Sequence, residues 1–304
     1  PAARPSRVEA DATDTWLARL AVTALIEEAL LTPKPALVDQ RGSGAHRDLD
    51  LVTMLRSAHS LGATFAELAS ASRRREPSAT LRSELARIGR AGEQAMLHAT
   101  NGSNAHRGAI WIVGLLVAGA AIAQVQPTAP RDAAAQAALA SSICTLGAQI
   151  ACFPDRFATP SDSNGERVRQ RYQVGGARRE AQDGFPHVAD VGLPALLAAR
   201  ANGVPENAAR LDTLLAIMAS LDDTCLLHRA GLPGLHAGKD GARRVLDLGG
   251  SSTVSGRAAL AELDRALLAL NASPGGAADL LAATLFIDML VRHGTGGSSA
   301  TWNI

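Results

Sequence analysis

Charged side chains are concentrated in one short stretch of this 304-residue chain, residues 32–50. The stretch carries one lysine, two arginines, one histidine and three aspartates. Pro33 and Pro35 bracket Lys34, so a preceding helix must stop and the lysine is expected on extended backbone. The Gly-Ser-Gly at 42–44 then allows the chain to reverse closely. A connecting loop needs glycine and proline but not this density of charge, so the pattern favours a ligand site over a solvated loop.

The helix expected before this stretch runs from Thr13 or Asp14 to about Leu31 and carries Glu28 on its apolar stripe. A carboxylate on a buried face is destabilising unless it is paired or bound to a cation. Two interpretations stay open: a cation site, or an ion pair with a neighbouring arginine. They predict opposite results for Glu28→Gln, because loss of repulsion between buried carboxylates would leave the fold intact or more stable, whereas loss of an ion pair would lower the melting temperature.

Two further turns have compositions typical of anion sites. His106 and Arg107 precede the apolar run 109–123, where the free N–H groups of a helix N-terminus attract anions. Two glycines precede Arg178 in the run Gly-Gly-Ala-Arg-Arg, which suits a close approach to phosphate. The run Gly-Gly-Ser-Ser-Thr at 249–253 could also hold phosphate, but such runs are more often only turns.

Carboxylates also stand at the ends of two expected helices. The helix that opens at Pro205 ends near Asp222 and Asp223, and its period places Asp222 on the apolar face with Asp223 beside it. Adjacent carboxylates at the end of a core helix are better candidates for a metal ligand or a base than a surface pair. Ser273 is expected to cap the last helix, with Asp279 in its first turns.

The composition indicates a globular helical protein: 47% of residues are hydrophobic, 19% charged and only 3% aromatic. Abundant Ala and Leu favour helices, since strands select β-branched and aromatic residues. A net charge of +1 gives no global field to attract nucleic acid or a membrane surface. The run 109–123 is shorter than a membrane span and is expected to be a buried central helix. Cys144, Cys152 and Cys225 lack metal-ligand spacing, which indicates reduced thiols in a cytoplasmic protein.

We predict an all-α fold in a single catalytic domain, residues 1–304, in which loops and helix ends of a multi-helix bundle converge on one cleft. Asp48 or Asp50 is expected to cap a helix that continues to about Ser70. The glycine-rich residues 231–256 are expected to be loop with at most a short helix. A homo-oligomer is compatible with the sequence, which does not specify one.

Several blocks of the sequence resemble the triphosphoribosyl-dephospho-CoA synthase family. The opening block is Thr-Pro-Lys-Pro-Ala-Leu-Val-Asp at 32–39, followed by Gly-Ala-His-Arg-Asp at 44–48. Glu28 stands where that family carries a glutamate. The remaining blocks are Asn-Ala-His-Arg-Gly-Ala-Ile at 104–110, Gly-Ala-Arg-Arg-Glu-Ala at 176–181 with Gly-Phe-Pro at 184–186, Asp-Thr-Cys at 223–225, and Ser-Pro-Gly-Gly-Ala-Ala-Asp-Leu-Leu at 273–281.

The resemblance implies an enzyme that joins ATP to 3'-dephospho-CoA and releases adenine. Its product would be passed to a transferase acting on an acyl carrier protein. The runs at 222–231 and 270–276 look most like the malonate decarboxylase branch rather than the citrate lyase branch. Such a reaction is expected to use Mg²⁺, because the triphosphate needs a cation or an Arg/Lys clamp.

The matching blocks imply roles for particular residues. Catalytic roles are implied for Glu28, Asp39, His46 and Asp223. Substrate binding is implied for Lys34, Asn104, His106, Arg107, Arg178, Glu180, Ser273, Gly275 and Gly276. Magnesium ligation is implied for Glu28, Asp48, Asp223 and Asp279, and which carboxylate acts as base stays open. The chain departs from the family pattern at Ala36, where Gly is usual, and at Ala105, where Thr is usual and a hydroxyl is lost.

Two other classes of function stay open at this point. One is a Mg²⁺-dependent hydrolase of nucleotide or ADP-ribosyl substrates, which would use the same side chains with water as acceptor. The other is a non-catalytic helical binder of the carrier protein or its prosthetic group. Clustering of so many acids in the matching blocks disfavours the second, because pure binding surfaces seldom place carboxylates on core helix ends.

Overall fold

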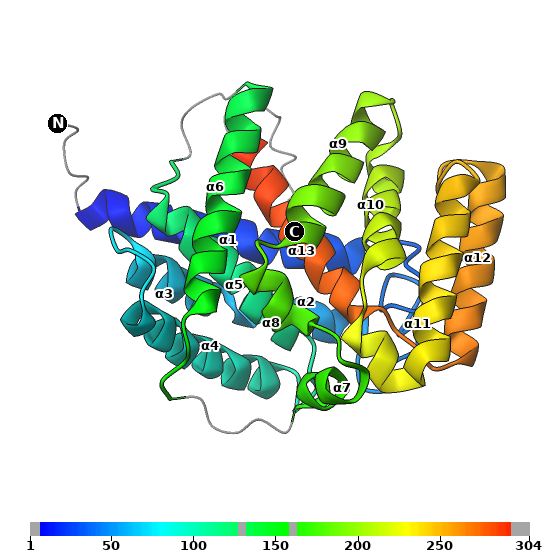
Figure 1. Ribbon diagram of the computed structural model, residues 1–304, viewed down its shortest axis with the longest axis horizontal. Coiled ribbons are helices and arrows are strands. Elements are labelled where there is room, and N and C mark those ends of the chain that lie inside the picture. Colours follow the sequence, from blue (N-terminus) through cyan, green and yellow to red (C-terminus); the bar gives the residue numbers. More distant parts are fainter. Residues whose placement is uncertain (1–6, 127–131, 158–162, 293–304) are drawn as a thin grey trace.

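The computed structural model describes residues 7–126, 132–157 and 163–292, and these residues form helices, turns and loops without a β-strand (Figure 1). The prediction of an all-α fold is therefore confirmed. The helices in chain order are α1 (Arg7–Leu30), α2 (Leu51–Ser60), α3 (Gly62–Ser72), α4 (Ala79–Ala99), α5 (Arg107–Ile122), α6 (Ala133–Cys152), α7 (Asn164–Tyr172), α8 (Gly176–Gln182), the π-helix η1 (His187–Gly192), α9 (Leu193–Ala201), α10 (Glu206–Ser220), α11 (Thr224–Asp247), α12 (Val254–Ala269) and α13 (Gly275–Arg292).

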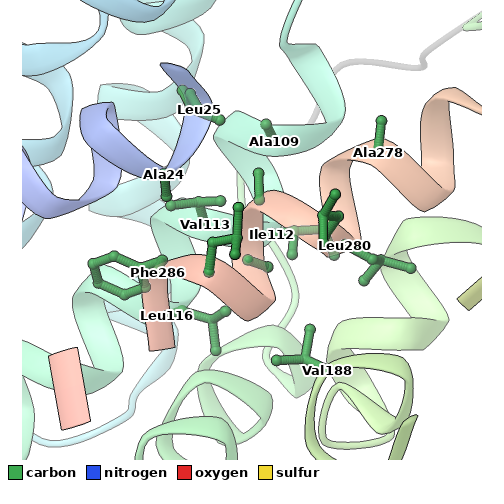
Figure 2. Close-up of a cluster of buried hydrophobic side chains, with 14 of the residues drawn as sticks. Ala24, Leu25, Ala109, Ile112, Val113, Leu116, Val188, Ala278, Leu280 and Phe286 are labelled. Atoms are coloured by element: carbon green, nitrogen blue, oxygen red, sulfur yellow. The ribbon is translucent and has the colours of Figure 1, made fainter. Parts of the chain in front are cut away.

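Helices α5 and α13 form the centre of the hydrophobic core. They pack against each other and against α1, while α6 covers both of them. Figure 2 shows Val113 and Leu116 of α5 beside Leu280 and Phe286 of α13, with Ala24 of α1 next to them. All five side chains are buried, at 4% exposure or less. A helix that is apolar on every side is stable only inside such a core, which confirms the prediction of a buried central helix at 109–123.

Helix α6 is, by length and composition, long and apolar enough to cross a membrane. Its residues Ile143, Cys144, Gly147 and Ile150 are buried, and the helix packs against α5, α8 and α13 within the helical assembly. The core helix of a soluble protein has the same properties.

Helix α1, at the start of the described chain, packs directly against α13, at its end (Figure 1). The helix that carries Glu28 in its last turns and the helix that carries Asp279 in its first turns are therefore neighbours in the fold. This packing brings Glu28 and Asp279 into one region although about 250 residues of sequence separate them.

Two expected helix boundaries are wrong. Helix α1 begins at Arg7 rather than at Thr13 or Asp14, and Asp14 is buried inside the helix, where it pairs with Arg73. The helix expected to continue to Ser70 is broken at Leu61 into α2 and α3. Asp50 caps α2 by accepting a hydrogen bond from the backbone N–H of Thr53, as the capping pattern predicted.

The prediction that residues 231–256 are mostly loop is wrong. Helix α11 continues through a kink at Gly231 to Asp247, and α12 returns beside it at one end of the molecule (Figure 1). A Cβ at Gly241 would lie 2.5 Å from the Leu263 side chain of α12, and one at Gly238 would lie 2.8 Å from Leu226. These glycines allow close packing of helices rather than a turn, and composition alone does not separate the two uses.

Replacement of Phe286 by Ala should destabilise the fold by about 3–5 kcal/mol, because the side chain is fully buried between α13 and its neighbours. Phe157→Ala is the matched control, since that ring is 71% exposed. Chemical denaturation of both variants measures the difference. Equal losses in the two variants would contradict the central position of α13 in the core.

Candidate active site

A buried ion pair joins the end of α1 to the loop that follows it. Lys34 Nζ donates to Glu28 Oε1 at 2.5 Å and to the Glu28 carbonyl oxygen at 2.6 Å. Lys34 is 1% exposed and Glu28 is 3% exposed. The predicted burial of Glu28 is thus confirmed, and its partner is a lysine six residues further on rather than an arginine.

The loop holds Lys34 in place through the carboxylate of Asp39. Asp39 Oδ2 accepts from the backbone N–H of Lys34 at 2.8 Å, and Oδ1 accepts from that of Arg41 at 2.8 Å. The chain reverses at Gly44, whose φ is +55° and where a Cβ would lie 2.4 Å from the carbonyl oxygen of Ala36. Only glycine fits this turn. The contacts of Asp39 position the loop, and its predicted catalytic role stays a prediction.

His46, on the same loop, faces the chain segment before α13. Its Nε2 lies 2.9 Å from Ser273 Oγ, and its Nδ1 lies 3.4 Å from the guanidinium of Arg229 and 3.9 Å from Asp48 Oδ1. Burial, and then the charge of Arg229, lower the pKa of His46 to about 4, against a small opposing effect of Asp48. His46 is therefore neutral at pH 7 and shares a hydrogen bond with a serine hydroxyl.

Arg229 is a site residue that the sequence analysis missed. Its guanidinium donates to the carbonyl oxygens of Ala45 at 2.7 Å and Asn271 at 3.2 Å, and so ties the loop to the segment before α13. The sequence signal that could have identified Arg229 is its position six residues after Asp223, in the same run that resembles the family.

Asp223 is buried and joins two helix N-termini. Its Oδ1 accepts from the N–H of Cys225 at 2.7 Å as the cap of α11, and its Oδ2 accepts from the N–H of Ala277 in α13 at 2.8 Å. Burial raises the pKa of Asp223, and these N–H groups oppose the rise. The prediction for Asp222 is wrong: α10 ends at Ser220, so Asp222 points outward and pairs with Lys239 at 2.7 Å.

Asp279, in the second turn of α13, lies against the N-terminus of α5. A Cβ at Gly108 would be 2.0 Å from Asp279 Oδ2, so the glycine leaves the space that the carboxylate occupies. Asp279 accepts a hydrogen bond from the N–H of Ala109. Burial, followed by the charges of Glu28 and Asp223, raises the pKa of Asp279 well above its ordinary value. The charges of Glu28 and Asp223 thus both act on Asp279 at the junction of α1, α5, α11 and α13.

His106 completes this junction. Its Nδ1 lies 2.6 Å from Ser57 Oγ, whereas its Nε2 is buried and has no hydrogen-bond partner. Burial, and then the charge of Lys34, lower the pKa of His106 to about 4. The imidazole is therefore neutral at pH 7, and one of its nitrogens is left for a ligand.

The neighbours of His106 in its block point outward. Arg107 pairs with Glu93 of α4 at 2.5 Å, and Asn104 Oδ1 accepts from the backbone N–H of Arg107 at 3.2 Å. Both side chains are exposed. Ala105, the departure from the family pattern, is half-buried between them, and nothing in the structure replaces the missing hydroxyl at this position.

The two predicted residues of α8 have separate surroundings. Glu180 is buried and accepts from the N–H of His187 at 2.9 Å, with its other oxygen 2.7 Å from His187 Nδ1. Glu180 therefore holds the start of η1. Arg178 is exposed and forms no ion pair with any described residue.

Gly275 and Gly276 begin α13 beside Asp223 and Cys225. A Cβ at Gly276 would lie 3.0 Å from Asp223 Oδ1, and one at Gly275 would lie 3.0 Å from Cys225 Sγ. Small residues here let the two helix N-termini share one carboxylate. Ser273, predicted as a helix cap, instead directs its hydroxyl to His46.

No group of three or more His, Cys, Asp or Glu side chains in the described residues is placed to hold a metal ion. Among the predicted ligands, Glu28 is paired with Lys34, Asp223 is bonded to backbone N–H groups, and Asp48 lies at the surface beside His46. Asp279 is buried and accepts a hydrogen bond from the backbone N–H of Ala109. The magnesium prediction stays a prediction.

This arrangement combines three chemical capacities. A carboxylate paired with an ammonium group can take a proton from a hydroxyl, and a neutral imidazole can donate a hydrogen bond. The N-termini of α5, α11 and α13 meet here, and their N–H groups donate to the carboxylates of Asp223 and Asp279. Such a site suits group transfer on an anionic substrate.

Comparisons with known proteins point the same way. The model of the family described as ATP:dephospho-CoA triphosphoribosyl transferase matches residues 14–297. A probable 2-(5''-triphosphoribosyl)-3'-dephosphocoenzyme-A synthase of Pseudomonas paraeruginosa is 57% identical over 275 residues, 90% of each chain. The 2-(5''-triphosphoribosyl)-3'-dephosphocoenzyme-A synthase of Klebsiella pneumoniae is 53% identical over 93% of this chain and 97% of its own. No solved structure matches the chain.

Glu28→Gln should destabilise the protein by about 3 kcal/mol or more, because the buried ammonium of Lys34 loses its counter-charge. Thermal or chemical denaturation measures the loss. The matched control is Glu27→Gln, whose carboxylate is 31% exposed and pairs with Arg210, and which should cost less than about 1 kcal/mol. A Glu28→Gln variant as stable as the parent would contradict the ion pair.

The contribution of His106 to the stability of the fold should fall as the pH is lowered from 7.5 to 5.5. His106 has a pKa of about 4 in the fold and an ordinary value of 6.5 in the unfolded chain, so between these values the unfolded chain binds a proton that the fold does not. The contribution of neutral His106 to the free energy of unfolding is complete above about pH 6.5. It is lost as the pH falls, and at pH 5.5 the free energy of unfolding is lower by about 1 kcal/mol. His106→Gln should reduce this pH dependence by that amount, whereas His98→Gln, at an exposed histidine of α4, should not. Identical pH profiles for the two variants would refute the assignment.

Proposed function

Because this chain belongs to the family of ATP:dephospho-CoA triphosphoribosyl transferases, we propose that it joins ATP to 3'-dephospho-CoA and releases adenine. The 2'-hydroxyl oxygen of dephospho-CoA attacks C1' of the ATP ribose, and the C1'–N9 bond breaks with its electron pair going to adenine. The hydroxyl proton goes to a base of the protein, and adenine takes up a proton. The product is 2'-(5''-triphosphoribosyl)-3'-dephospho-CoA.

The observation that carries this proposal is the junction at which Glu28 and Asp223 act on Asp279, together with the unpaired Nε2 of His106 at the start of α5. By analogy with glycoside chemistry, the transition state has oxocarbenium character and is stabilised by negative charge near C1'. The three carboxylates supply that charge. N–H groups of the helix N-termini at the same place hold Asp223 and Asp279 in position.

Glu28 is the proposed base. Its Oε1 is bonded to Lys34, while Oε2 has no hydrogen-bond partner among the described residues. The carboxylates of Asp39 and Asp223 are each bonded to two or more backbone N–H groups, so protein donors already occupy both oxygens of each. Glu28 has an oxygen left to accept the hydroxyl proton.

Mg²⁺ fits the proposed site through Asp279. The raised pKa of this carboxyl results from burial and from two like charges, and a cation would relieve that repulsion. Mg²⁺ is usually held by one or two carboxylates together with phosphate oxygens and waters. Asp279, beside Glu28, would be its protein ligand, and the ion would neutralise charge on the triphosphate.

His106 is the proposed hydrogen-bond donor to the substrate. Its Nδ1 lies beside the Ser57 hydroxyl, so its Nε2 is the nitrogen available to a ligand. Adenine leaves more readily when a donor interacts with a ring nitrogen, because the departing ring gains electron density. The low pKa of His106 keeps the imidazole neutral, so it acts by donating a hydrogen bond rather than a full proton.

We also propose that the product serves a malonate decarboxylase, through a transferase that loads an acyl carrier protein in the cytoplasm. The runs at 222–231 and 270–276 support this branch over the citrate lyase branch. Arg229 and Cys225, in the first run, lie at the site itself. Transfer of the product to a malonate decarboxylase carrier protein, and not to a citrate lyase carrier protein, would support the assignment, and the reverse preference would contradict it.

The rival interpretation as a hydrolase uses the same side chains with water as the acceptor. The named relatives are synthases, which favours a transferase over both a hydrolase and a non-catalytic binder. The two enzymes differ in one measurable property: a hydrolase releases adenine or phosphate without dephospho-CoA.

Incubation with ATP, dephospho-CoA and Mg²⁺ should therefore yield free adenine and the joined product in equal amounts, as measured by chromatography. Adenine should stay at background without dephospho-CoA, and chelation of Mg²⁺ should abolish its release. Intact CoA should react far more slowly, because its 3'-phosphate adds bulk and charge beside the attacking hydroxyl. Adenine release that is indifferent to dephospho-CoA would overturn the transferase proposal.

A further inference from the structure

A pocket of about 210 Å³ lies beside the junction described above. It is formed by α3, α4 and α5 with Asp155, and its wall includes Arg82, Arg90, Arg107 and Trp111. One of its lining residues, Arg107, directly follows His106 in the sequence. Its volume is below that of a typical site for a whole drug-sized ligand, so it suits one part of a larger substrate.

Arg82 differs from the other cations of the pocket wall. Arg90 pairs with Asp155 at 2.6 Å, and Arg107 pairs with Glu93 at 2.5 Å. Arg82 forms no ion pair with a described residue, and its Nε is buried without a hydrogen-bond partner. Burial chiefly lowers the pKa of Arg82, Arg90 adds to the effect, and Asp155 opposes it.

Trp111 holds Arg82 in position. The guanidinium carbon of Arg82 lies over the indole ring, 4.7 Å from its centroid. A guanidinium that rests on an aromatic face keeps the N–H groups at its edge free for a planar, bidentate partner. The side chain is thus ordered in advance for an oxyanion.

A second unpaired arginine lies next to this pair. Trp111 Nε1 donates to the carbonyl oxygen of Ala177 at 3.0 Å, which places the first turn of α8 beside the pocket wall. The next residue is Arg178, whose charge acts on Arg82 and lowers its pKa further. Two like charges close together are unfavourable, and an anion between them removes that repulsion.

We propose that this pocket binds the phosphate chain of a substrate nucleotide, with Arg82 and Arg178 as its anion partners. The inference rests on the proposed function for its choice of nucleotide, since both substrates of that reaction carry such a chain: the triphosphate of ATP and the diphosphate of dephospho-CoA. Directed bonds from two guanidinium groups suit phosphate oxygens of either. The position next to His106 would set the sugar of that nucleotide at the carboxylate junction.

Calorimetric titration of the full chain with inorganic tripolyphosphate and pyrophosphate tests the pocket without any turnover. Arg82→Met keeps the apolar stem over Trp111 and removes the charge, and should weaken binding about tenfold or more. Arg178→Gln should do the same, and because Arg178 is exposed this variant should fold like the parent. The control is Arg87→Met, an exposed arginine of α4 outside the pocket that pairs with Glu67. Unchanged affinity in Arg82→Met, or equal weakening in the control, would overturn the proposal.

Steady-state kinetics then identify the source of the phosphate chain. A KM for ATP that rises about tenfold in Arg82→Met, with that for dephospho-CoA unchanged, assigns the triphosphate, and the opposite split assigns the diphosphate. If neither KM rises, or if adenosine competes for the pocket and pyrophosphate does not, the proposal is wrong. Should Arg82→Met fail to fold, Arg82→Lys keeps the charge but loses the planar fork and carries the same test. A parent enzyme that makes no joined product would refute the proposed function, while the calorimetry would still decide the pocket.

Discussion

The buried ion pair between Lys34 and Glu28 is the interaction on which the rest of the site depends. Taking two charges out of water costs several kcal/mol per ion, so the pair is stable only when its geometry is fixed and its other polar atoms are satisfied. Asp39 and the turn at Gly44 provide that geometry. The charges of the pair then act on the site around them: the ammonium disfavours protonation of His106, and Glu28 disfavours ionisation of Asp279.

The second constraint is the close approach of helix N-termini. Asp223 accepts from the N–H groups of both α11 and α13, and Asp279 accepts from the first turn of α5. Small residues at these contacts, Gly108 and Gly276, leave room for the carboxylates. N–H groups from three helices thus stabilise buried carboxylates in one region, and the negative charge there favours developing positive charge. A reaction that moves an anionic sugar phosphate through a cation-like transition state needs both.

The site has two sides with opposite electrostatic character. Acids gather where α1, α5 and α13 meet, whereas arginines gather one turn further along α5 around Trp111. Helix α5 carries His106 on the first side and Arg107 and Trp111 on the second. A joining reaction has to hold two phosphorylated nucleotides and one reacting carbon, and under the proposed function this division would separate phosphate binding from the chemistry at the sugar. The paired arginines, Arg90 and Arg107, fix the wall of the pocket, while Arg82 forms no ion pair with a described residue.

Local periodicity determined a good part of this protein. The apolar composition of 109–123 predicted a central helix, and the phase of Glu28 predicted its burial, because both follow from 3.6 residues per turn. The resemblance located the blocks that carry Lys34, His106, Asp223 and Asp279, but not how they meet.

Tertiary structure decided the partners: Glu28 pairs with a lysine that a loop folds back. Asp223 rather than Asp222 is buried, because α10 ends at Ser220, whereas its apolar pattern in the sequence continues for two more residues. The glycine-rich residues 231–256 are largely helical, and their glycines allow α11 and α12 to pack closely. The contact between Arg82 and Trp111 joins two separate helices, α4 and α5. Sequence spacing within one segment cannot encode contacts of this kind, since they exist only once distant segments share a core.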